Sequence, residues 1–126
     1  MTQISRRLLL GSVAAAALVP ASALAQDAPD LSKLAEPPAH GEIAEGAEAA
    51  KVTIIEYASA SCPHCAAFYT DIYPVLKKDY IDTGKVRFIF REFPHNDAGL
   101  GGFMVARCAA PDKYMNVVGV LFKTQA

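Results

Sequence analysis

The chain has 126 residues, which leaves room for at most one domain. It carries 12 basic and 13 acidic side chains, a net charge of −1, and this balance argues against nucleic acid or an anionic membrane surface as its partner. Its three cysteines, Cys62, Cys65 and Cys108, are an odd number, which does not suit a purely structural disulfide framework.

Residues 1–25 have the features of a secretory signal. Arg6 and Arg7 precede an apolar, alanine-rich stretch, and small residues at Ala23 and Ala25 predict cleavage after Ala25. Retention of the stretch as a membrane anchor is the alternative. The arginine pair also fits a twin-arginine signal, so the Sec and Tat routes both stay open. Without these two arginines the mature chain has 10 basic and 13 acidic residues, a net charge near −3. No segment of the mature chain is apolar enough to insert into a membrane.

Residues 26–45 are rich in Ala, Pro, Gly and Glu, which predicts a flexible N-terminal arm with at most a short strand around Ile43. The domain is expected to fill residues 46–126. It begins with a run of β-branched and aromatic residues at 51–58, KVTIIEYA, which predicts a strand. Because the run is nearly continuous, we expect both faces of this strand to be covered, with Glu56 as an exception that needs a reason.

A helix is predicted to begin at Cys62-Pro63, because proline at the first helical position leaves no helical hydrogen bond unmade. Its apolar stripe consists of Tyr69, Ile72, Tyr73, Leu76 and Tyr80. Pro74 lies inside the stripe and should bend the helix without ending it. The sequence Asp82-Thr83-Gly84 is a typical helix stop.

The alternating residues of KVRFIFREFP, 85–94, predict a second strand. Asn96 or Asp97 can cap a following helix, whose apolar face is expected to hold Leu100, Phe103, Met104 and Cys108. On that face Cys108 would be a buried, inert thiol. Pro111 should start a last helix, with an apolar side of Tyr114, Met115, Val118, Leu121 and Phe122. The order strand, helix, strand, helix, helix favours an α/β fold with two parallel strands and a right-handed crossover.

The spacing of Cys62 and Cys65 across a strand–helix junction indicates a reactive dithiol. A thiolate on Cys62 can accept the unpaired N–H groups at the start of a helix, where the dipole is positive. The dipole supplies about 0.3–1 kcal/mol, and one pKa unit corresponds to about 1.36 kcal/mol, so a stronger effect needs further hydrogen bonds and the side chain of His64. Pro63 fixes the backbone between the cysteines. A stabilised thiolate favours the reduced form, which makes the disulfide a stronger oxidant.

Two other interpretations of the cysteine pair are open at this point, and a third is excluded. A structural disulfide over so short a loop would add little chain-entropy stabilisation. A soft-metal site, for copper, would use the thiols, whereas zinc would need two more ligands than the pair provides. Haem attachment is excluded, because Ala66 stands where that motif requires histidine.

The segments VTIIEYASASCPHCAAFY and GKVRFIFREFP resemble the DsbA-like family of bacterial periplasmic thiol–disulfide oxidoreductases, over residues 46–126. The resemblance implies a thioredoxin-like fold, with Cys62 as the attacking cysteine, Cys65 as the resolving one and His64 as a thiolate stabiliser. It also matches Glu56 to a buried acid that relays protons near the buried cysteine. No cofactor is implied beyond the cysteine pair. A disulfide isomerase or reductase is the nearest alternative.

The resemblance further implies a periplasmic location, unfolded exported proteins with free thiols as substrates, and a DsbB-type, quinone-linked membrane protein as the oxidant. Members of the family continue beyond the helical insertion with further strands, a cis-proline loop and a last helix. Ala126 falls inside or just after that insertion. We therefore expect a fragment that lacks the C-terminal strands and helix and that folds poorly alone.

Overall fold

The computed structural model describes residues 30–125, so the predicted signal at 1–25 lies outside the described residues. Compact packing divides the chain after Glu36 into two units. The described part of the first unit contains a short 3-10 helix, η3 (Leu31–Ala35), whose first turn is capped by the Asp30 carboxylate accepting the Ser32 N–H. Within residues 30–125, no helix has both the length and the apolar character needed to cross a membrane.

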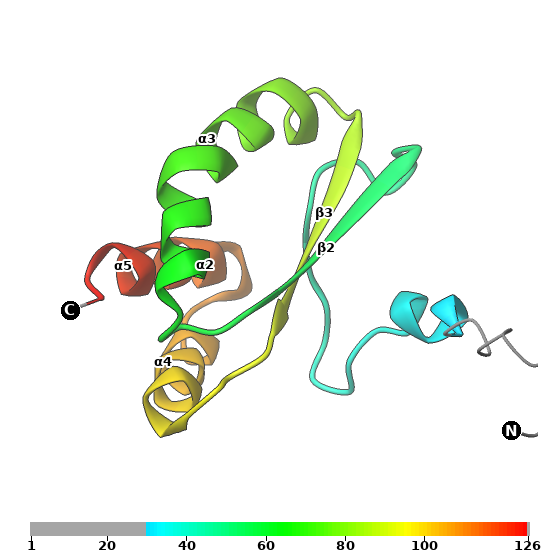
Figure 1. Cartoon of the computed structure of the whole chain (residues 1–126). Coiled ribbons are helices and arrows are strands. Elements are labelled where there is room, and N and C mark those ends of the chain that lie inside the picture. The colour runs from blue at the N-terminus through cyan, green and yellow to red at the C-terminus, as the bar shows by residue number, and fades with distance from the viewer. Residues whose placement is uncertain (1–29, 126) are drawn as a thin grey trace, which may run out of the picture. The chain divides into compact units, whose positions relative to one another are not determined.

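The second unit begins at Pro37 and contains the predicted order of strand, helix, strand, helix, helix, preceded by the short strand near Ile43 (Figure 1). Its elements in chain order are β1 (Ile43–Glu45), β2 (Val52–Ala58), α2 (Pro63–Ala67), η4 (Phe68–Ile72), α3 (Tyr73–Leu76), η5 (Lys77–Ile81), β3 (Val86–Glu92), α4 (Asp97–Arg107), η6 (Pro111–Lys113) and α5 (Tyr114–Lys123). The predicted α/β architecture is confirmed.

The sheet has the strand order β1-β3-β2. The predicted parallel pair is confirmed: β2 runs alongside β3 from Val52 opposite Val86 to Ala58 opposite Glu92. The short strand expected around Ile43 is also confirmed, and it pairs antiparallel with β3. The prediction that β2 is covered on both faces is wrong for the described residues. There β2 is an edge strand, and Val52 and Tyr57, which point to opposite faces of the sheet, are both exposed.

The helix that follows β2 runs from Pro63 to Ile81 without a break at Pro74, as predicted. Its turns η4 and η5 are π-helical, with each N–H bonded five residues back. These wider turns rotate the apolar stripe, so Tyr73 is buried whereas Ile72 and Tyr80, which were predicted to lie with it, are exposed. Gly84 ends the segment with a positive φ of 75°, a conformation that favours glycine.

The core lies between the sheet and the helices, which are the long helix from Pro63 to Ile81 together with α4 and α5. Phe90 of β3 packs against the rings of Phe103, Tyr114 and Phe122 from α4 and α5. The apolar side predicted for α5 is confirmed, because Tyr114, Val118 and Phe122 are buried.

The face predicted for α4 is mostly wrong, since Leu100, Met104 and Cys108 are exposed and Phe103 alone of that set is buried. The reason is backbone packing. Gly99 and Gly102 turn toward the segment between β2 and α2, where a β-carbon would meet other side chains at 2.6 Å and 3.0 Å. The helix therefore presents its small residues and Phe103 to the domain, and Leu100, Met104 and Val105 to solvent.

Candidate active site

The turn between β2 and α2 (Figure 1) ends at Cys62, as predicted, and Cys65 lies in the first turn of α2. Cys62 is the N-cap of α2, with extended backbone at φ −90°, and its own N–H donates to the Ser59 carbonyl at 3.0 Å. Pro63 occupies the first helical position. The turn therefore places the Cys62 sulfur at the unpaired N–H groups of the helix start.

The Cys62 sulfur accepts a hydrogen bond from the Cys65 N–H, with 3.5 Å between N and Sγ. The Cys65 thiol, then the Cys65 N–H, and more weakly the His64 N–H, lower the pKa of Cys62 by hydrogen bonding to its thiolate. The negative charge of Glu56 acts in the opposite direction, to a smaller extent. The local backbone thus favours an anion at position 62.

Cys65 lies one turn into the helix and packs against the hydrophobic core. Burial, followed by the hydrogen bond with Cys62, raises the pKa of the Cys65 thiol. None of the three cysteines is joined to another in this structure. Two thiols in one turn of helix therefore differ in character: Cys62 favours the thiolate, and Cys65 keeps its proton.

Glu56 is partly buried on β2, and burial raises its pKa from 4.5 to about 7. Its charge also raises the pKa of both Cys62 and Cys65. Glu56 therefore lies close enough to the dithiol for its charge to act on both sulfurs. His64 is exposed, and its backbone N–H acts on the Cys62 sulfur, whereas a contribution from its imidazole stays a prediction.

Ser59 is a residue that the sequence interpretation missed. It is completely buried in the turn before Cys62, and its hydroxyl oxygen accepts the backbone N–H groups of Ser61 and His95. The available signal was a serine directly after an apolar strand. His95 itself lies in an exposed loop.

Cys108 is not part of this site. It caps the C-terminal end of α4, exposed to solvent, with its thiol donating to the Met104 carbonyl at 3.3 Å. The expectation of a buried thiol was wrong because α4 turns its other face inward. Among the residues that the structure describes, no cluster of three or more His, Cys, Asp or Glu side chains is arranged to hold a metal ion.

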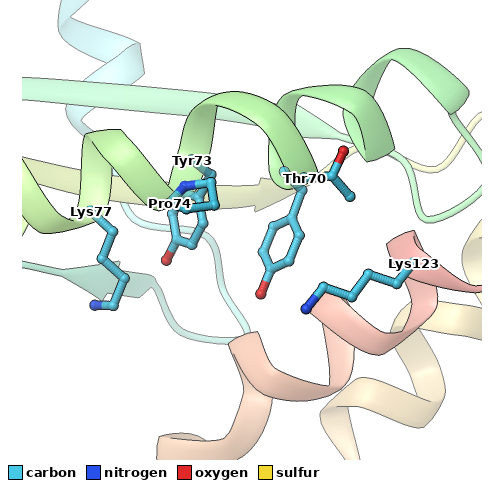
Figure 2. Close-up of a pocket in the computed structure, with 6 residues that line it drawn as sticks. Thr70, Tyr73, Pro74, Lys77 and Lys123 are labelled. Carbon is cyan, nitrogen blue, oxygen red and sulfur yellow. The ribbon is translucent and has the colours of Figure 1, made fainter.

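Two cavities lie near the helix that carries the cysteines. One, of about 340 Å³, adjoins the active turn and is lined by Ala60, Ser61, Pro63, Ala98, Leu121, Thr124 and Gln125. The other, of about 290 Å³, lies between the middle of this helix and α5 (Figure 2). No cysteine lines the second cavity, and its Tyr73 hydroxyl and Lys77 ammonium already bond to Glu45. The first cavity is lined by Ser61 and Pro63, the two neighbours of Cys62 in the chain.

A parallel strand pair covered by helices, with a Cys-Pro-His-Cys turn between the first of these strands and its helix, defines a thioredoxin-like dithiol protein. The chain belongs to the thioredoxin family, since the family model described as Thioredoxin matches residues 39–126.

Relatives with recorded names are similar to the chain over part of their length. A Rickettsia bellii protein, provisionally named a protein-disulfide oxidoreductase, is 36% identical over 81 residues, which cover 64% of this chain and 31% of the relative. Disulfide bond formation protein D of Bacillus subtilis is 40% identical over 55 residues, 44% of this chain and 25% of the relative. The chain thus spans less than a third of either relative.

Among solved structures, alpha-DsbA1 of Wolbachia pipientis is similar at 35% identity and a TM-score of 0.66, over 74% of this chain and 47% of that one. Oxidised BdbD of Bacillus subtilis is similar at 29% identity and a TM-score of 0.62, over 72% of this chain and 51% of that one. The resemblance to DsbA-like proteins is confirmed by these matches.

Proposed function

We propose that the protein is a thiol–disulfide oxidoreductase whose disulfide between Cys62 and Cys65 is passed to thiols of exported proteins. The observation that carries the proposal is that the pKa values of two thiols three residues apart are shifted in opposite directions. The pKa of Cys62 is lowered by hydrogen bonds, and the pKa of Cys65 is raised by burial. Names of relatives as protein-disulfide oxidoreductases and disulfide bond formation proteins support the same chemistry.

In the proposed reaction, a substrate thiolate attacks the Cys62 sulfur of the oxidised pair. The bond between the two cysteines breaks, Cys65 leaves as a thiolate, and a mixed disulfide forms. A second substrate thiolate then attacks the substrate sulfur of this mixed disulfide and expels Cys62. Two electrons have passed to the pair, and the substrate carries the disulfide. Cys62 is a good leaving group because its thiolate is stabilised.

Glu56 is suited to exchange a proton with Cys65 in this reaction. Its pKa of about 7 lets it hold or release a proton near neutral pH, and its charge reaches both cysteines. The proton that Cys65 takes up when it leaves would come from this carboxyl.

The proposed setting is the periplasm, with export by a Sec or Tat signal and reoxidation by a DsbB-type, quinone-linked membrane protein. The similarity to DsbA structures supports this setting. A disulfide isomerase or reductase is the alternative. The reduction potential of the pair distinguishes an oxidase, at roughly −120 mV, from a thioredoxin-type reductase, at roughly −270 mV.

The test is oxidation of a reduced, unfolded substrate protein by the purified protein, compared with its Cys62→Ser variant. The variant should lose all dithiol oxidation and insulin reduction. Cys108→Ser is the matched control, because it removes an exposed thiol at the C-terminal end of α4 and should keep full activity. Full activity of Cys62→Ser would refute the assignment. Bound copper at one equivalent per pair, with no redox activity, would favour a metal-binding function instead.

A further inference from the structure

Three polar side chains tie the active turn to the start of α4. The Ser61 hydroxyl donates to Asn96 Oδ1 at 2.9 Å, and the hydroxyl oxygens of Ser59 and Ser61 lie 3.1 Å apart. Asn96 is the N-cap of α4, and its Oδ1 also accepts the Gly99 N–H at 2.9 Å. We call Ser59, Ser61 and Asn96 the polar clamp. It joins segments that are 35 residues apart in sequence.

The donor and the acceptor of each hydrogen bond in the polar clamp can be assigned, starting from the backbone N–H of Gly99. The backbone N–H of Gly99 can only donate, so the atom of Asn96 that faces it is the oxygen. Ser61 must then give its one hydroxyl proton to that oxygen. The bond between the two hydroxyls is therefore donated by Ser59, whose oxygen in turn accepts the N–H groups of Ser61 and His95. A fully buried hydroxyl with all its bonds made holds its segment in one position.

Ser59 also contacts both cysteines through its backbone. Its carbonyl accepts the Cys62 N–H at 3.0 Å, and its own backbone hydrogen bond to the Cys65 sulfur favours the Cys65 thiolate. A shift of Ser59 would therefore move the groups that surround both sulfurs. Gly99 closes the other side of the polar clamp, because a β-carbon there would lie 2.6 Å from the Ser59 hydroxyl and 3.0 Å from that of Ser61.

We propose that the polar clamp is a positioning device that sets the reduction potential of the Cys62–Cys65 pair by fixing the active turn against α4. The inference rests on the proposed redox function of the pair. Ser59, Ser61 and Asn96 do not touch the reacting sulfur bond through their side chains. Their hydrogen bonds fix Ser59, whose carbonyl accepts the Cys62 N–H and so keeps the Cys62 sulfur at the start of the helix. Loosening the clamp therefore weakens the stabilisation of the Cys62 thiolate and makes the disulfide a weaker oxidant.

The experiment compares the redox equilibrium with glutathione for the wild-type protein and for Ser61→Ala. The whole contribution of one hydrogen bond of ordinary strength sets an upper limit on the change, about fivefold toward the disulfide, or about 20 mV at 29.6 mV per tenfold. The pKa of Cys62, followed by thiolate absorbance, should rise in the same variant. Ser61→Thr keeps the hydroxyl and should restore wild-type values of both.

Asn96→Ala breaks the polar clamp from its other end and should shift the equilibrium in the same direction. The double variant should shift it no further than either single change, because both remove the same link. Thr83→Ala is the matched control: it removes a hydroxyl that bonds the Asp79 and Tyr80 carbonyls at the far end of the helix. It should lower stability only.

A Ser61→Ala protein that loses stability but keeps the wild-type equilibrium and Cys62 pKa would overturn the inference, as would the same result for Asn96→Ala. The outcome is separable from the proposed function. A wild-type pair that equilibrates with glutathione but fails to oxidise protein thiols would refute the proposed function, and the comparison of variants would still decide the role of the polar clamp.

Discussion

Replacement of Glu56 by glutamine should remove a pH-dependent loss of stability. Burial raises the pKa of Glu56 in the folded chain from 4.5 to about 7. Between these values the folded chain binds more protons than the unfolded one, so the free energy of unfolding falls as the pH rises through this window. The difference of about 2.5 pKa units, at 1.36 kcal/mol each, sets an upper bound of about 3 kcal/mol. Because the carboxyl keeps some contact with solvent, we expect about 2 kcal/mol.

The assay is urea unfolding of the wild-type protein and the Glu56→Gln variant across this pH range. The two should have similar stability at pH 4.5 and below, where the carboxyl is protonated. Above pH 7 the variant should be more stable by about 2 kcal/mol, because glutamine fills the same space without a charge. The pKa of both active-site thiols should also fall, since the charge of Glu56 raises each of them.

Parallel stability curves for the two proteins over this pH range would refute the reasoning. They would mean that Glu56 is as well solvated in the folded chain as in the unfolded one, and its proposed role in proton transfer to Cys65 would lose its support.

Three further predictions concern packing. Phe90→Ala should cost about 3–5 kcal/mol in urea unfolding, because this buried ring meets three other aromatic rings; a loss below about 1 kcal/mol would contradict the described core. Gly119→Ala should cost about 1–3 kcal/mol and lower the Tm, because a β-carbon would overlap the Tyr69 ring; an unchanged Tm would show that α5 packs elsewhere. Cys108→Ser should change stability by less than about 0.5 kcal/mol, and a larger loss would indicate a buried thiol.

Local sequence accounts for the elements and for the position of the cysteine pair. β-branched residues before Ser59 form β2, and Pro63 begins the helix, so Cys62 becomes the N-cap. Asn96 and Gly84 mark element ends through their own side-chain or backbone chemistry. Each of these features depends on residues within one or two turns of one another, which is why the strand–helix order and the reactive turn could be predicted.

Tertiary packing decided which faces are buried and how the two thiols differ. The inward face of α4 follows from the close approach of Gly99 to Ser59, a contact across 40 positions that no periodicity reveals, and Cys108 is exposed as a result. The burial that raises the pKa of Glu56 and Cys65 likewise arises only when the chain has folded. The sequence alone determined where the dithiol lies, because helix starts are local. Its electrostatic environment was decided only in the folded structure, because desolvation depends on every segment that packs around it.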